Sequence, residues 1–294
     1  MIKLATNETV EKKGRPPFLD ELGSAYGLRH RNAVLLTGDV EGIFWDRVRK
    51  GYASLEELLV SELKEKFLMA RMNIGSGVTF YDSESRGEAR KIHTETNGGE
   101  TDQSAPKDSG AEIVTEESLI VSRRRRSRTK EDPLGFDWQV KETISQPLIA
   151  LTFLRNLAES FLAVRKQKVV TKPLAMVIQY AGSIFPAGDF GRMDMRDRQR
   201  LVSFQDWISS EGFVEGPDLI ILIAETKSEI NDKIMSRPNV AHLEIALPSK
   251  VEREHLVNLF VEGNPVLTFA EGQKGQKDFV ENTAGLSLAA IHDI

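Results

Sequence analysis

Three dense runs of apolar residues constrain the fold of this 294-residue chain more than any other feature of its sequence. They are AVLLTG at 33–38, LAMVIQYAG at 174–182 and DLIILIAE at 218–225. Runs without polar alternation are typical of strands that are covered on both faces, as in a parallel sheet. Helix-like segments separate these runs, so the pattern predicts an α/β fold.

The periodicity of the other segments completes this outline. Apolar residues at three- and four-residue spacing predict helices at 18–29, 54–67, 143–167, 194–209, 250–262 and from 277 to the end. Ser54 and Glu57 have the spacing of a capping box, and Pro147 suits the first turn of a helix. Two further strands are expected within 67–82 and one at 240–247. We therefore expect a parallel sheet of about five strands flanked by helices.

Composition excludes several classes of protein. The chain has no cysteine, which excludes a disulfide scaffold and any thiolate metal site. Its net charge of −5 argues against non-specific binding of nucleic acid by the whole surface. We expect no membrane association and a cytoplasmic location, because the N-terminus is polar and no apolar run approaches the ~20 residues that cross a bilayer. The five histidines show no metal-ligand spacing, so no metal is expected.

Residues 83–132 differ in composition from the rest of the chain. They contain no Phe, Trp or Tyr and carry many charges, which predicts a flexible insertion with one short strand at 111–122. A basic run then follows the acidic part of the block: Arg123, Arg124, Arg125 and Arg126. These arginines either contact phosphate or an acidic partner, or stay solvated beside their acidic neighbours.

The C-terminal half carries a resemblance to a known family. A buried strand at Ile220–Ala224 is followed by Arg237-Pro238, then by a strand ending in Leu247-Pro248, then by a helix with the Glu252-Arg253 pair. In these motifs the chain resembles the core of an AAA+ ATPase of the P-loop NTPase superfamily. The turn with Thr283, Gly285 and Ser287 resembles part of the lid of that family. The resemblance implies a RecA-like core at 1–248 and an incomplete helical lid at 249–294.

The phosphate-binding loop that this family requires is absent. No G-x-x-x-x-G-K-[ST] pattern occurs in the chain, and TGDVEGIFWDR follows the first strand instead. Gly38, Asp39 and Gly42 are interpreted as a remnant of the loop. Phe44 and Trp45 stand where the lysine and hydroxyl residue belong, and the carboxylate of Asp39 would repel phosphate.

The other catalytic positions that the resemblance implies are changed as well. The strand in the Walker B position ends in Gln179 and Tyr180 rather than in acidic residues. Thr226, or Lys227 beside it, takes the polar sensor position. The arginine finger is absent, and Arg237 is left as a helix-end cap or as part of an interface salt bridge. The chain thus resembles the degenerate N-terminal ATPase-like half of a two-domain AAA protein.

We therefore predict a non-catalytic domain without a cofactor, which serves assembly, self-association or contact with a protein partner. A C-terminal AAA domain of the same polypeptide would supply ATP hydrolysis. One alternative is a domain that binds ATP or ADP with magnesium through an atypical loop. Another is a nucleic-acid-binding adaptor that acts through the arginines between Arg123 and Arg128. Asp189 and Arg192 lie in a Gly-, Asp- and Arg-rich loop that is predicted either to contact a partner or to be merely solvated.

Overall fold

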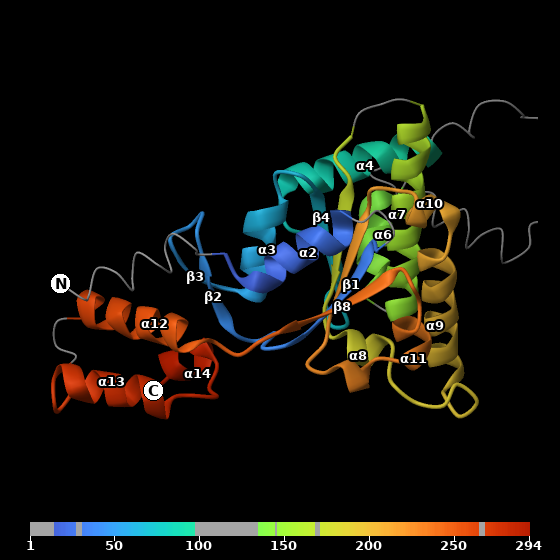
Figure 1. The fold of residues 1–294 in the computed structure, drawn as a ribbon. Coiled ribbons are helices and arrows are strands. Elements are labelled where there is room, and N and C mark those ends of the chain that lie inside the picture. Colours follow the sequence, from blue (N-terminus) through green and yellow to red (C-terminus); the bar gives the residue numbers. More distant parts are fainter. Residues whose placement is uncertain (1–14, 28–30, 98–134, 145, 168–170, 265–267) are drawn as a thin grey trace, which may run out of the picture.

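A six-stranded sheet is the centre of the molecule (Figure 1). The computed structural model describes residues 15–27, 31–97, 135–144, 146–167, 171–264 and 268–294. The strand order is β5-β4-β6-β7-β1-β8. The strands are β1 (Ala33–Gly38), β4 (Leu68–Asn73), β5 (Gly77–Phe80), β6 (Leu174–Ile178), β7 (Leu219–Ile223) and β8 (Val240–Ile245).

Five of these strands are parallel to one another, which confirms the predicted parallel sheet of about five strands. The three densest apolar runs form its centre, where β7 lies between β6 and β1. Strand β5 departs from the prediction, because it pairs with β4 in the antiparallel direction at the edge of the sheet. Only residues 74–76 connect the two strands, and so short a connection can only form a hairpin.

Helices cover both faces of the sheet (Figure 1). Helices α2 (Pro17–Gly27) and α3 (Leu55–Leu63) pack on one face with Val34 and Leu36 of β1. Ala33 and Leu35 point to the other face, where the covering elements are α4 (Ser83–Asn97), α6 (Phe136–Glu142), α7 (Pro147–Lys166), α8 (Ala181–Ile184), α9 (Met195–Ile208), α10 (Glu211–Val214) and α11 (Asp232–Met235). Alternate residues of one strand therefore enter two separate hydrophobic clusters.

Helix α7 is long and apolar enough to cross a membrane by length and composition, which the sequence-based expectation overlooked. Half of its apolar window is buried within the protein, and the helix packs against α4 and α9. The predicted position of Pro147 in the first turn of this helix is confirmed. Its apolar residues therefore belong to the core of the domain.

The predicted flexible insertion at 83–132 is wrong for its first 15 residues, because Ser83–Asn97 form helix α4. Ala89 and Ile92 are buried against the sheet, and the Ser85 hydroxyl accepts a hydrogen bond of 2.9 Å from the Met69 backbone. Two apolar residues three positions apart are enough to hold one face of a helix. The predicted strand at 111–122 and Arg123–Arg126 lie outside the described residues.

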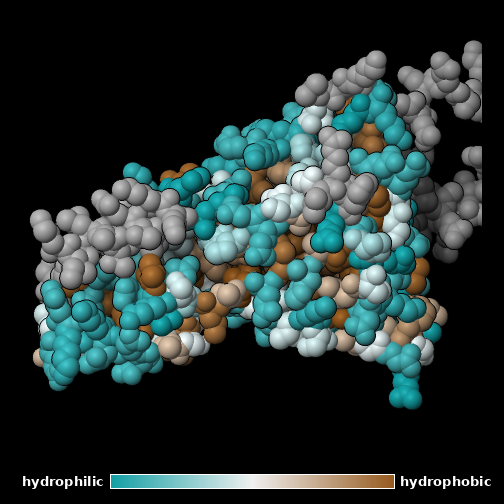
Figure 2. All heavy atoms as spheres, in the orientation of Figure 1, coloured by the Kyte–Doolittle hydropathy of each residue, from teal (hydrophilic) through white to brown (hydrophobic). Residues whose placement is uncertain are grey.

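A group of three helices follows the sheet: α12 (Lys250–Gly263), α13 (Gln273–Asn282) and α14 (Leu288–His292), called the helical unit below. Its own hydrophobic cluster consists of Leu256, Val257, Val280, Leu288 and Ile291. The buried Arg253 joins its parts, since the guanidinium donates to Pro248 O at 2.7 Å and to Val280 O at 3.3 Å. On the face that Figure 2 shows, the visible surface of the unit is mostly hydrophilic.

A β-hairpin separates β1 from α3, and the sequence analysis did not predict it. Strands β2 (Ile43–Asp46) and β3 (Gly51–Ser54) pair in the antiparallel direction. The predicted capping box of Ser54 and Glu57 is confirmed at the start of α3. The residues that the resemblance placed in a phosphate loop and helix thus lie partly in this hairpin, whose strands lie between the sheet and the helical unit (Figure 1).

Candidate functional site

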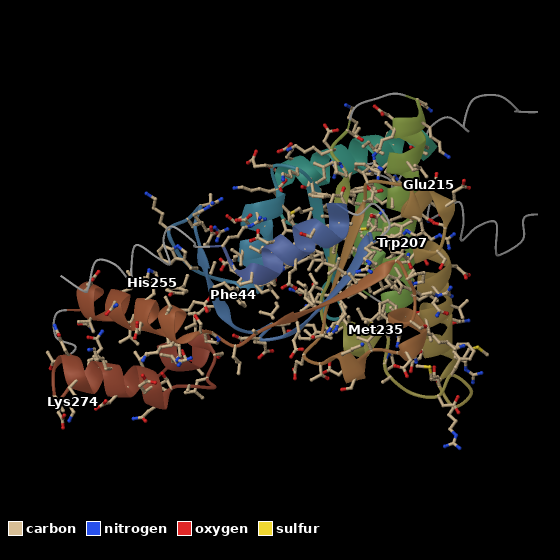
Figure 3. All side chains as sticks on the ribbon, viewed as in Figure 1. Phe44, Trp207, Glu215, Met235, His255 and Lys274 are labelled. Carbon is tan, nitrogen blue, oxygen red and sulfur yellow. The ribbon has the colours of Figure 1, made fainter. Side chains whose placement is uncertain are left out.

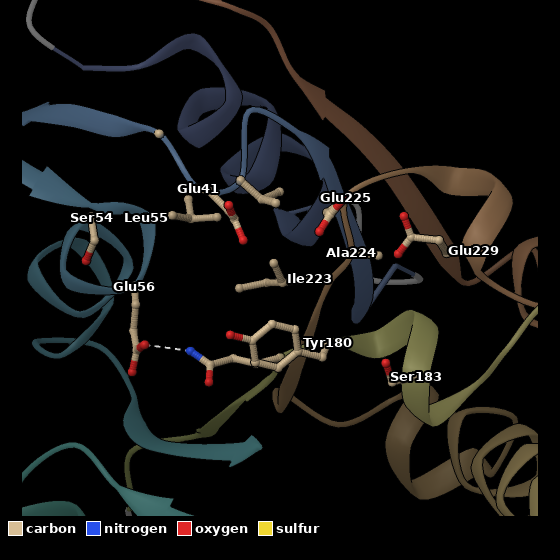
Figure 4. A pocket seen from close by; sticks show the side chains of 13 residues that line it. Glu41, Ser54, Leu55, Glu56, Tyr180, Ser183, Ile223, Ala224, Glu225 and Glu229 are labelled. Carbon is tan, nitrogen blue, oxygen red and sulfur yellow. Dashed lines mark hydrogen bonds between the residues drawn. The ribbon is translucent and has the colours of Figure 1, made fainter. Parts of the chain in front are cut away.

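A cavity of about 270 Å³ lies beyond the carboxyl ends of β1, β6 and β7 (Figure 4). This is the edge at which ligands bind in parallel α/β sheets. Four acidic side chains line the cavity, namely Glu41, Glu56, Glu225 and Glu229. The described residues that line it include no Lys, Arg or His. We call it the edge cavity, and its lining would repel a phosphate group.

The loop after β1 uses most of its backbone N–H groups within the protein. The N–H of Gly38 donates to Glu225 O and that of Asp39 donates to Ile245 O, both at 3.0 Å. The N–H of Val40 donates to Gly38 O at 2.7 Å, and that of Gly42 to Asp39 O at 3.3 Å. A phosphate loop must offer these groups to its ligand. In this conformation the four N–H groups already have protein acceptors.

A side chain at either glycine of this loop would come close to other atoms of the protein. Gly38 has a φ of +93°, and a Cβ atom at this position would lie 2.3 Å from Ile245 O. A Cβ at Gly42 would lie 2.5 Å from the carboxylate of Asp39. Gly38 is therefore explained by its positive φ and by a backbone contact that exists without a ligand, whereas the contact at Gly42 is only with the end of a flexible side chain.

A carboxylate of the protein occupies the helix start that faces the edge cavity. Glu56 lies in the first turn of α3, where a negative charge is favourable. Its Oε1 accepts from Arg71 Nη1 at 2.6 Å, and its Oε2 accepts from Gln179 Nε2 at 2.5 Å. The Gln179 side chain in turn accepts from Asn73 Nδ2 at 2.9 Å. Gln179, which directly follows β6, thus links β4 to α3 through its amide.

Glu56, Arg71 and Asn73 were not predicted from the sequence as residues of this site. A signal for Glu56 was present, because it lies between the two capping residues Ser54 and Glu57. Arg71 also interrupts an otherwise apolar strand. Neither signal reveals that the two side chains meet, since they are on different elements and pair only in the folded chain.

Tyr180 follows Gln179 with an unusual backbone conformation. Its φ is +52°, in the left-handed region that a bulky side chain rarely adopts. The ring lines the edge cavity and is 58% exposed. Such a conformation costs about 1–3 kcal/mol and persists only where the surrounding structure imposes it.

Thr226 does not line the edge cavity, but its hydrogen-bonding partner Glu229 does. Its backbone N–H and hydroxyl each lie 3.0 Å from Glu229 Oε1, which forms a capping box over the 3₁₀ turn Lys227–Glu229. The carboxylate of Glu229 lines the cavity, whereas Thr226 is not among its lining residues. The structure therefore explains Thr226 as a turn-capping residue.

Asp39 lies on a second cavity of about 370 Å³, called the junction cavity. Phe44 and Tyr52 of the hairpin and Pro248 and Leu288 at the helical unit also line it. Burial raises the pKa of the Asp39 carboxyl above its usual value. The residues of the predicted loop remnant are therefore divided, with Asp39 facing one cavity and Gly42 facing the other.

The predicted interaction residues lie apart from both cavities. Asp189 and Arg192 form one exposed turn between α8 and α9, in which their side chains approach to 3.9 Å. Arg237 lies two residues after the end of α11, is half-buried, and donates its backbone N–H to Ile234 O at 3.1 Å. Within the described part of the chain, no three His, Asp or Glu side chains form a metal-ligand group.

One of three comparisons with known proteins, the match to a family model, agrees with this architecture. A sequence profile described as "AAA+ chaperone, N-terminal Rossmann-like domain" matches residues 7–246. No curated protein matches the chain significantly. Among solved structures, a chain of the E. coli MS115-1 HORMA:CdnC:Trip13 complex is similar, with 12% identity and a TM-score of 0.44. The alignment covers 94% of this chain and 66% of that one, so this chain spans somewhat less than two thirds of its length.

Proposed function

Because the chain belongs to the family of N-terminal, Rossmann-like domains of AAA+ chaperones, we propose that it is a non-catalytic module of a larger AAA+ ATPase. It serves assembly or contact with a protein partner and needs no nucleotide of its own. A second AAA domain in the same polypeptide supplies ATP hydrolysis. The whole protein acts in the cytoplasm, away from membranes.

The loop at Gly38–Gly42 is the observation that carries this proposal. Four of its backbone N–H groups are bound to carbonyl oxygens of the protein. It leads into strand β2 rather than into a helix whose N-terminus could face a phosphate. The N-terminus of α3, which does face the edge cavity, already holds the Glu56 carboxylate.

Electrostatics support the same conclusion. ATP would bring several negative charges to a cavity lined by four glutamates. Arg71 is close by, but its guanidinium is engaged by Glu56 and also donates to Thr79 Oγ1 at 2.8 Å. A phosphate would have to displace Glu56 from Arg71 before it could pair with this guanidinium, which weakens binding.

Calorimetric titration of the chain with ATP and with ADP, each with Mg²⁺ at millimolar concentration, tests the proposal. We expect no saturable binding and no hydrolysis above the buffer background. A Kd below about 100 µM, equivalent to roughly −5.5 kcal/mol, would overturn it. The Glu56→Gln variant, which removes the resident charge, serves as the control that shows whether that carboxylate excludes nucleotide.

A further inference from the structure

We propose that the β2–β3 hairpin is a built-in clasp that fixes the helical unit on the sheet without any bound ligand. The inference concerns the position of the helical unit, so it stands whether or not the domain contacts a partner. It rests on three features of the hairpin, namely its two faces, its buried contact with α12 and its fixed ends.

The two faces of the hairpin pack against different parts of the protein. Phe44 is buried in the core cluster beneath α2, where its ring meets Phe18 edge-on at 5.5 Å between centroids. Ile43 and Tyr52 pack against the hydrophobic cluster of the helical unit instead. Successive side chains of a strand point to opposite faces, so one short ribbon can bind both bodies at once.

The contact with α12 is centred on a buried histidine (Figure 3). His255 is 1% exposed, and its Nδ1 shares a hydrogen bond of 2.8 Å with the Tyr52 hydroxyl. The indole of Trp45 meets the same imidazole edge-on, with 4.8 Å between ring centroids. Trp45 and Tyr52 are a cross-strand pair, so both strands of the hairpin hold this one residue.

The hairpin is itself held at both ends and at its turn. The first strand follows a loop in which the N–H groups of Gly38 and Asp39 donate to Glu225 O and Ile245 O. The second strand ends at Ser54, which forms the capping box of α3. In the turn, the buried Asp46 carboxylate accepts from the N–H groups of Val48 and Arg49 at 2.8 and 3.1 Å. A rigid ribbon can transmit the orientation of the core to α12.

The covalent link between the sheet and the helical unit is short, and Arg253 of α12 donates a hydrogen bond of 2.7 Å to Pro248 O within it, so its freedom to rotate lies at Leu247. It passes through Leu247, which is 52% exposed, and Pro248. With the hairpin contacts removed, the chain could rotate at this link. The hairpin is therefore the element whose loss should release the helical unit.

Distance measurements between paired spin labels test the clasp. The natural chain has no cysteine, so Lys274→Cys on α13 and Asp206→Cys on α9 can be labelled selectively. We expect one narrow distance distribution in the labelled chain. Tyr52→Phe should broaden it by removing the hydrogen bond, and Trp45→Ala should broaden it further. Val48→Ala, at a hairpin-turn residue that is 60% exposed, is the matched control and should change nothing.

Two outcomes would overturn the clasp: a broad distribution in the labelled parent, or unchanged distributions in both Tyr52→Phe and Trp45→Ala. Circular dichroism identifies a variant that fails to fold. If Trp45→Ala does not fold, the milder Tyr52→Phe variant still tests the clasp. Repeating the measurement with Mg-ATP separates the two proposals. A shift caused by ATP in the parent would contradict the proposed function, whereas broadening in the variants alone supports the clasp.

Discussion

Gly38 shows how a residue typical of phosphate loops can be required for a different reason. Its positive φ and its approach to Ile245 O would exclude a side chain even if no ligand ever bound here. Gln179, directly after β6, is likewise explained by contacts within the protein, because its amide joins Asn73 to Glu56. At the scale of residues, the positions that the resemblance assigns to a nucleotide site are filled by groups that hydrogen-bond to one another or pack together.

We expect Gly38→Ala to lower the free energy of unfolding by about 2–3 kcal/mol, because it adds backbone strain and a clash with a carbonyl oxygen. Gly23→Ala is the control. Nothing lies within 4 Å of a Cβ at that helical position, so the change should be neutral or stabilising by up to about 1 kcal/mol. Urea unfolding of the two variants measures both effects. Equal stabilities would show that the loop relaxes freely at Gly38.

At the scale of elements, the strongly patterned segments were predictable. The strands at 33–38, 174–182 and 218–225 are confirmed to within a few residues, and so is the helix that starts after Ser54. Helix α4 was not predicted, because its charged residues outnumber the few apolar ones that anchor it. The hairpin was hidden by the resemblance, since Phe44 and Trp45 were compared with loop positions instead of being considered as alternating strand residues.

The candidate site was harder to predict than the sheet. Its location at the carboxyl ends of the strands followed from the topology. The pairing of Glu56 with Arg71 and Gln179 did not, because it joins side chains 15 and 123 positions apart. Such contacts depend on the register of the strands, which single-sequence patterns do not specify.

Helices α4 and α6 are joined by an ion pair that should titrate in acid. Asp137 of α6 accepts hydrogen bonds from Arg90 and Arg86 of α4, and these contacts lower the pKa of its carboxyl from 3.8 to about 2. A carboxyl whose pKa is lower in the folded state than in the unfolded chain stabilises the fold at any pH above its unfolded-state pKa. This contribution is lost as the pH falls through the pKa of the folded state.

We therefore expect the stability of the chain to decline between about pH 5 and pH 2, with part of the decline absent in Asp137→Asn. The pair is partly exposed, so its share should be modest and should shrink in high salt. Denaturant unfolding at several pH values measures it. Glu159→Gln, which breaks the exposed Arg155–Glu159 pair within α7, is the control. Parallel pH profiles for the parent and Asp137→Asn would contradict the assignment.

At the scale of the whole molecule, each face of the sheet has its own buried hydrophobic cluster, formed by side chains of the described elements. Helices α4 and α6, which flank residues 98–134, both pack on α7. Their anchoring side chains, such as Ile92 and Phe136, are almost fully buried. The stability of the domain should therefore depend little on the identity of the residues between these two helices.

Replacing residues 98–134 with a Gly/Ser segment of equal length should leave the unfolding midpoint unchanged. The same variant tests the nucleic-acid alternative, because it removes Arg123–Arg126. DNA binding that weakens steeply with salt in the parent and is lost in the variant would support that alternative. We expect no such difference. A large fall in the unfolding midpoint would show that the segment contributes to the core.

The hairpin between β1 and α3 also bears on how the domain could change over time. Placing lysine and serine at Phe44 and Trp45 would put them on a strand that pairs with Ala53 and Tyr52, not at the start of a helix. Point substitutions therefore cannot rebuild a phosphate loop here; the hairpin would have to be excised and the backbone rejoined. In evolutionary terms, a nucleotide site at this position would require a rearrangement of the backbone, which a series of single substitutions does not supply.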